Sequence, residues 1–153
     1  MDDRYVAGLF DGEGVVRINR KQRGVHRGYN LHVAIGMNYY PVVKALCDAY
    51  GGSVHMNRHD LRNPKNRIQF SWIVANQKAA TFLRRILPFA IVKLDEIVIA
   101  LKLQDHIDAN PYISAGRNHM LERKNRDKIL AYREELCIQI SALKKRSFPP
   151  LTE

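Results

Sequence analysis

Two acids alternating with two glycines, Asp11-Gly12-Glu13-Gly14, end a short apolar segment near the start of the chain. Residues 5–10 of that segment read as a helix whose large side chains leave two small residues, Ala7 and Gly8, on one face. Small residues let a second helix approach closely, and the helix dipole disfavours an acid at the C-terminal end. Two such helices side by side would bring two acids together, and a divalent cation between the acids would stabilise the pair. The stretch therefore predicts a close helix pair with a metal ion at its foot. The simpler alternative is an ordinary helix with a glycine C-cap.

Charge distribution points to a polyanionic partner. The chain has 153 residues, of which 46% are apolar, enough for one domain with a hydrophobic core. Its formal net charge is +10. Between residues 14 and 94 there are fourteen Lys and Arg but only two acids, Asp48 and Asp60. The positive charge therefore lies in the part of the chain that we expect to form strands, as in a nucleic-acid-binding surface.

Cysteine and histidine usage indicates neither disulfides nor a zinc site. Cys47 and Cys137 fall inside apolar helical patterns and should be buried thiols in a reducing compartment. His55 and His59 are four apart, a spacing that suits zinc on a helix, but they fall on a strand and its turn. Acids directly after Met1 argue against a signal peptide, and no apolar run is long enough to cross a membrane. We therefore expect an intracellular protein that is not secreted.

Hydrophobic periodicity predicts the order helix, two strands, helix, two strands and then helices. The first helix covers residues 2–11, and a glycine-marked connection at 22–28 joins strands at 14–21 and 29–35. A helix that begins around residues 39–41 and ends at 50 precedes strands at 53–58 and 66–72, which a loop at 59–65 separates. A third helix begins after residue 76 and is broken at Pro88, and a fourth covers 92–106. After a loop at 108–115, a long last helix runs over 117–145. We take residues 1–146 as a single domain and 147–153 as a frayed tail.

Period-two alternation gives the strands a core face and a polar outer face. The expected core residues are Tyr29, Leu31, Val33, Ile35, Val54, Met56, Ile68, Phe70 and Trp72. The expected DNA-binding residues are Arg17, Asn19, Lys21, Asn30, His32, Ser53, His55, Asn57, Arg67, Gln69 and Ser71, with Arg27 in the connection. A two-stranded ribbon with a polar face and a basic tip suits the major groove of DNA. Arg27 suits a base or a phosphate contact, and the mixed polar side of the last helix suits a solvated face or phosphate contacts.

Residues 6–14 resemble, position by position, the nine-letter signature of the LAGLIDADG homing endonucleases, with Glu13 in place of the usual last Asp. The element order is also the αββαββα order of that family, and residues 87–89 followed by Lys93 look like the family's. The resemblance covers roughly residues 5–103. It implies an α+β fold whose four-stranded antiparallel sheet forms a saddle for DNA, here with extra C-terminal helices.

By resemblance, a chain with one copy of the signature works as a homodimer. The implied interface residues are Tyr5, Ala7, Gly8, Asp11 and Gly12. The family implies hydrolysis of one phosphodiester in each strand of a long pseudo-palindromic site, with Mg²⁺, Mn²⁺ or another divalent cation, leaving short 3′ overhangs. It also implies intron homing, in a bacterial cytoplasm or an organelle. Glu13 and the main-chain carbonyl of Gly14 are the implied metal ligands, Glu13 and Lys93 the implied catalytic residues, and Asp11 is mainly structural.

Other functions stay open on the sequence alone. Lys93 could be an ordinary surface lysine at a helix start, and Glu13 is longer than Asp, so the metal geometry could differ. Where relatives place polar network residues, this chain has residues 37–40, of which Asn38 or a tyrosine hydroxyl could substitute. An RNA maturase or a cleavage-deficient DNA-binding protein of the same type would keep the fold, although the intact acid at Glu13 argues against lost cleavage. A structural RNA-binding protein with a basic αβ surface would need neither a dimer nor a sequence-specific DNA site.

Overall fold

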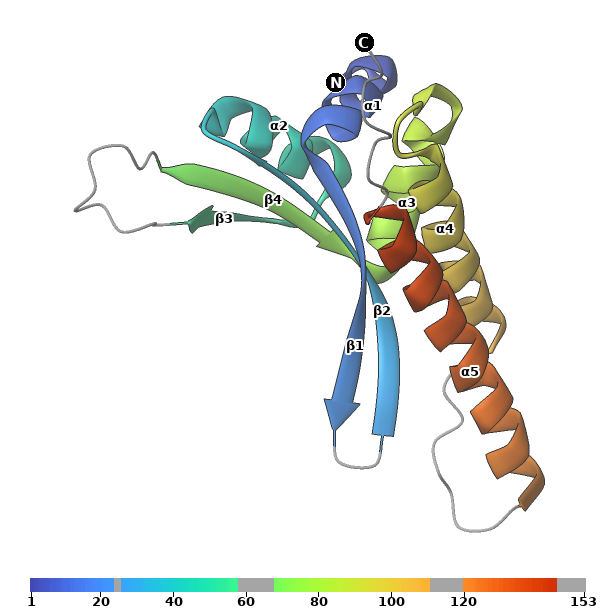
Figure 1. Cartoon of the computed structure of the whole chain (residues 1–153). Helices are drawn as coiled ribbons and strands as arrows, with labels where there is room; N and C mark the ends of the chain where they lie inside the picture. The colour runs from blue at the N-terminus through green and yellow to red at the C-terminus, as the bar shows by residue number, and fades with distance from the viewer. Residues whose placement is uncertain (24–25, 58–67, 111–119, 146–153) are drawn as a thin grey trace.

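The computed structural model describes residues 1–23, 26–57, 68–110 and 120–145, and it confirms the α+β order expected from the sequence (Figure 1). The elements are α1 (Asp3–Glu13), β1 (Gly14–Arg23), β2 (His26–Met37), α2 (Tyr40–Tyr50), β3 (Ser53–Asn57), β4 (Gln69–Ala75), α3 (Asn76–Ile86), the short 3-10 helix η1 (Leu87–Phe89), α4 (Leu94–Ala109) and α5 (Met120–Leu143). Within the described residues, no helix combines the length and the apolar character needed to cross a membrane.

The four strands form one antiparallel sheet in the order β1-β2-β4-β3. In the β1-β2 ribbon, Gly14 pairs with Ile35 and Lys21 with Gly28, so every second residue faces the same way along both strands. Leu31, Val33 and Ile35 are fully buried beneath the helices, as their alternation predicted. Helices α1, α2 and α3 pack on the sheet, while α4 and α5 run side by side along the β1-β2 ribbon (Figure 1).

An aromatic cluster ties the helices to the sheet. The Phe82 ring meets the rings of Phe10, Tyr50 and Trp72 edge-on, with centroids 5.5, 5.0 and 4.8 Å away. The indole Nε1 of Trp72 donates to the Gly51 carbonyl oxygen at 2.7 Å, which satisfies the buried donor. These contacts fix α1 and α3 against the same part of the sheet.

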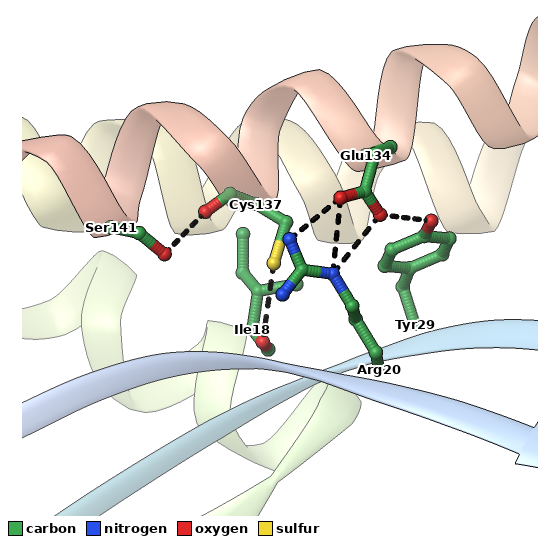
Figure 2. A network of polar contacts seen from close by, with 6 residues as sticks. All are labelled: Ile18, Arg20, Tyr29, Glu134, Cys137 and Ser141. Atoms are coloured by element: carbon green, nitrogen blue, oxygen red, sulfur yellow. Dashed lines mark hydrogen bonds and ion pairs between the residues drawn. The ribbon is translucent and has the colours of Figure 1, made fainter.

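Helix α5 covers the free edge of β1, as Figure 2 shows. The Arg20 guanidinium donates to both carboxylate oxygens of Glu134, with Nε 3.1 Å from each, and the Tyr29 hydroxyl donates to the same carboxylate at 2.5 Å. Nearer the start of β1, the Cys137 thiol donates to the Ile18 carbonyl oxygen at 3.5 Å. An uncovered edge strand would leave such backbone groups unpaired. The C-terminal helix α5 therefore packs against the β1-β2 ribbon.

The elements differ from the sequence prediction in several places. The expected connection at 22–28 is mostly strand, because β1 continues to Arg23 and β2 begins at His26. Met56 and Ile68, expected in the core, are 47% and 41% exposed, since Met56 lies near the end of the edge strand β3 and Ile68 lies before β4 begins. Helix α4 begins at Leu94 rather than at residue 92, because a side chain of α1 binds the preceding backbone N–H groups. The loop expected at 59–65, residues 66–67, the start of the last helix before residue 120 and the tail at 147–153 lie outside the described residues.

Candidate nucleic-acid interface and acidic centre

Asp11 joins the end of α1 to the start of α4. Its carboxylate accepts hydrogen bonds from the main-chain N–H groups of Ile91, Val92 and Lys93, at 2.8, 3.1 and 3.0 Å. In return, the Lys93 ammonium donates to the main-chain carbonyl oxygen of Asp11 at 2.7 Å. Because charge-assisted bonds of this kind are strong, they fix the Lys93 side chain at the C-terminal end of α1. Asp11 therefore has a structural role within one chain.

Glu13 is the last residue of α1, and its side chain is exposed. The last turn of α1 contains no basic residue, and among the described residues the Glu13 carboxylate has no hydrogen-bond or ion-pair partner. The carbonyl end of the helix dipole disfavours a carboxylate at this position. The structure thus holds a negative charge in an unfavourable field, where a bound cation would stabilise it.

Gly14 turns the chain directly from α1 into β1. A Cβ at this position would lie 2.2 Å from a ring carbon of Phe10 and 2.5 Å from the Phe10 carbonyl oxygen, so only glycine fits. The main chain of Gly14 is thereby fixed beside Glu13. A carboxylate next to a carbonyl oxygen is a donor set that Mg²⁺ accepts. In the described part of one chain, no group of three His, Cys, Asp or Glu side chains could hold a metal ion, so Glu13 and Gly14 offer only part of a site.

One face of α1 is open, and we call it the open α1 face: Tyr5, Gly8 and Gly12. A Cβ built on either glycine would meet no atom within 4 Å, and Tyr5 is 53% exposed. Ala7, which we expected on this face, is instead fully buried with Val6 and Phe10 in the core of its own chain. The small residues available to a second helix are therefore the two glycines.

Two apolar residues that the sequence analysis missed lie next to the open α1 face. Ile91 and Val92 are 82% and 74% exposed, and their main chain is held against Asp11. Large apolar side chains exposed beside a small-residue face mark an interaction surface. A pair of branched apolar residues shortly after Pro88 was the available signal, but the sequence analysis assigned Val92 to the start of the fourth helix.

Polar residues expected to bind DNA gather on the outer face of the sheet. Cross-strand pairing places Arg17 opposite His32, Asn19 opposite Asn30, and His55 opposite Ser71. The exposed members are Arg17, Lys21, Ser53 and His55, and the half-buried ones are Asn19, Asn30, His32, Gln69 and Ser71. The side chains of Arg27 and Asn57, and the whole of Arg67, lie outside the described part of the chain.

In the described part of the chain, two of these side chains have a polar atom without a hydrogen-bond partner. Among the described residues, Asn30 Oδ1 and His32 Nδ1 are buried with no hydrogen-bond partner. Burial lowers the pKa of His32, and the positive charge of Arg17 lowers that pKa further, so the imidazole is neutral at neutral pH. A neutral imidazole offers one donor and one acceptor. On this face, the exposed cations can neutralise phosphates, and the polar side chains supply donors and acceptors for base edges.

Lys144, directly after α5, contacts β1 close in sequence to Asp11, Glu13 and Gly14, the three residues that we call the acidic centre. Its ammonium donates to the main-chain carbonyl oxygen of Val16, two residues beyond Gly14. Burial lowers the pKa of Lys144, Glu96 opposes that effect, and the charges of Arg17 and Lys93 add to it, so these side chains are electrostatic neighbours. The sequence analysis did not single out Lys144, because its position depends on how the last helix folds back on β1.

Comparison with known proteins identifies the fold. No family model matches the sequence, and no curated protein matches it. Among solved structures, the chain is similar to the archaeal intron-encoded homing endonuclease I-Vdi141I complexed with DNA, with a TM-score of 0.71 and 15% identity over 98% of this chain and 88% of that one. It is also similar to the homing endonuclease I-CvuI in complex with its target (TM-score 0.69, 15% identity, 95% and 85% of the chains) and to the homing endonuclease I-TnaI (TM-score 0.68, 14% identity, 95% of each). The chain therefore has the fold of the LAGLIDADG homing endonucleases, as the resemblance of its residues 6–14 predicted.

Proposed function

We propose that the chain is a site-specific DNA endonuclease that acts as a homodimer and hydrolyses one phosphodiester in each DNA strand with a divalent metal ion. The observation that carries this proposal is the exposed Glu13, which has no partner among the described residues. It stands at the end of the open α1 face and at the start of a sheet whose outer face is polar and cationic. Structures of this fold include homing endonucleases in complex with DNA, among them I-CvuI in the presence of Ca or Mg.

The open α1 face suits two-fold pairing of two chains. The glycines allow two helices to approach closely, and pairing would cover Tyr5, Ile91 and Val92, which are too exposed for a lone domain. The same symmetry would bring both copies of Glu13 to the centre and set the two sheets end to end as one saddle. A two-fold protein reads a pseudo-palindromic site, because each half contacts the same bases.

Glu13 and the Gly14 carbonyl oxygen would hold Mg²⁺, for which Mn²⁺ or another divalent cation could substitute. The second copy of Glu13 supplies the additional carboxylate that one chain lacks. When bound, a metal ion here would supply an activated water and stabilise the leaving oxygen. Lys93, which Asp11 fixes at the same helix end, adds a positive charge where negative charge develops on the phosphate.

The outer face of the sheet would contact DNA along the saddle. Arg17, Asn19 and His32 lie in adjacent cross-strand pairs and present donors and acceptors to base edges in the major groove. Lys21 lies toward the far end of the ribbon, where it suits a base or phosphate contact. Phosphate neutralisation by this basic surface would supply most of the affinity.

Selection of cleaved sites from a randomised duplex library with Mg²⁺ tests the proposal. We expect enrichment of one pseudo-palindromic site whose ends carry short 3′ overhangs. A parallel selection for binding with Ca²⁺ separates cleavage from recognition. If the folded protein enriches a bound site but cuts none of it in Mg²⁺, the chain is a DNA-binding protein without cleavage. If neither selection enriches any duplex, the result contradicts a DNA-directed function altogether.

A further inference from the structure

We propose that Lys144 is a further cation of the cleavage centre, which binds a DNA phosphate beside Glu13 and Lys93 and so links the C-terminal helix to the reaction. The inference rests on the proposed endonuclease function and adds to it a residue from outside the αββαββα part of the chain.

The position of Lys144 is fixed at the start of β1. Its ammonium donates to the carbonyl oxygen of Val16, the third residue of the strand that begins directly after Glu13. An ammonium has three donors, so the contact with Val16 leaves two for another acceptor. Among the ammonium groups described, Lys93 and Lys144 reach main-chain carbonyls that flank Glu13 and Gly14 in sequence, those of Asp11 and Val16.

The surrounding charge favours an anion. The positive charges of Arg17 and Lys93 act on the Lys144 ammonium and lower its pKa, while the negative charge of Glu96 opposes them there. Cations held close together repel one another, and a phosphate among them would offset that repulsion. The outer face of the sheet and the acidic centre meet at this point, because Arg17 belongs to the outer face and Lys93 binds Asp11 of the centre.

Covering the strand edge does not account for a cation here. Further along the same edge, the Cys137 thiol satisfies the Ile18 carbonyl and Glu134 binds Arg20 and Tyr29 (Figure 2). A neutral donor would satisfy the Val16 carbonyl equally well. Lys144 instead places a partly desolvated ammonium near two other cations, an arrangement that a polyanionic partner explains.

The test compares Lys144→Met with Lys102→Met on the duplex that the wild-type protein selects. Lys102 is an exposed lysine on α4, so its substitution makes the same change in net charge away from the proposed site. We expect Lys144→Met to slow single-turnover cleavage in Mg²⁺ by about a hundredfold. The slope of log affinity against log salt, measured in Ca²⁺, should fall by about 0.9 for each subunit. Lys102→Met should change neither quantity.

If the folded Lys144→Met protein keeps the wild-type cleavage rate and the wild-type slope of log affinity against log salt, the inference is overturned. The proposed endonuclease function would still stand. Because losing the Val16 contact can loosen α5, a second measurement uses the wild-type dimer. Its lysines are acetylated in Ca²⁺ with and without DNA. DNA should protect Lys144 and leave Lys102 reactive, and equal labelling of Lys144 in both samples would overturn the inference as well. A wild-type protein that cuts no duplex overturns the proposed function first, and this inference with it.

Discussion

Replacing Gly8 separates the folding of one chain from the pairing of two. In one chain, a methyl group at residue 8 meets no atom within 4 Å. Gly8→Ala should therefore stabilise the single chain by about 0.5–1 kcal/mol, because alanine favours the helix more than glycine does. In the dimer, the same methyl group is inserted once from each copy into a close helix contact, at about 1–3 kcal/mol each. The sum of about 2–6 kcal/mol corresponds to a dissociation constant raised roughly 30-fold to more than ten-thousandfold.

Gly8→Ala should stabilise the single chain but weaken the dimer, so the two effects can be measured separately. Sedimentation equilibrium over a range of concentrations measures the dissociation constant, and thermal unfolding at the lowest concentration measures the stability of the single chain. Gly8→Leu, which inserts a larger group, should abolish dimerisation and DNA cleavage together. Ala131→Leu, a small-to-large change at an exposed position of α5, is the control and should leave association unchanged. A Gly8→Leu protein that remains dimeric, or a wild-type chain that is monomeric at micromolar concentration and still cuts DNA, would refute the reasoning.

Three further changes test separate parts of the account. Asp11→Asn should lower the free energy of unfolding in urea by about 1.5–3 kcal/mol, the value of one charged hydrogen bond to the backbone ahead of α4, and lost cleavage at full stability would contradict that role. Arg17→Ala should cost about 1–3 kcal/mol of DNA affinity at one base of each half-site, whereas uniform weakening at every base would mark a phosphate contact. Burial lowers the pKa of His106 from its usual 6.5, and Arg133 lowers that pKa further, so the unfolded chain binds the proton more readily and stability falls as pH drops below 6.5. His106→Gln should flatten that part of the stability curve, and an unchanged curve would argue against the effect.

Local periodicity was enough to predict the strands and the two faces of β2. Along β2, Leu31, Val33 and Ile35 alternate with polar residues, and a strand buried on one face permits only one such assignment. The glycines at 51 and 52 likewise end α2, because both have positive φ and a Cβ at residue 52 would lie 2.3 Å from the Ile73 carbonyl oxygen. Patterns of this kind depend on neighbours close in sequence.

Contacts between residues far apart in the sequence could not be predicted from the sequence. Adjacent small residues in α1 could not be assigned to faces, because Ala7 packs against its own core while Gly8 stays open. Lys144 contacts Val16 across 128 positions of sequence, so its place depends on the whole course of α4 and α5. The exposure of Ile91 follows in the same way from its backbone contact with Asp11, 80 positions away.

The most direct test of the central claim is cleavage by the Glu13→Gln dimer in Mg²⁺, measured beside its affinity for the same duplex. The substitution keeps the size and hydrogen bonding of the side chain but removes a negative charge from the proposed metal site, so hydrolysis should be lost. Binding should remain, and could rise slightly, because the basic sheet supplies the affinity and the repulsion between carboxylate and phosphate is relieved. Lost cleavage with retained binding is the predicted result. Unimpaired cleavage would remove Glu13 from the reaction, and joint loss of cleavage and binding would make its role structural.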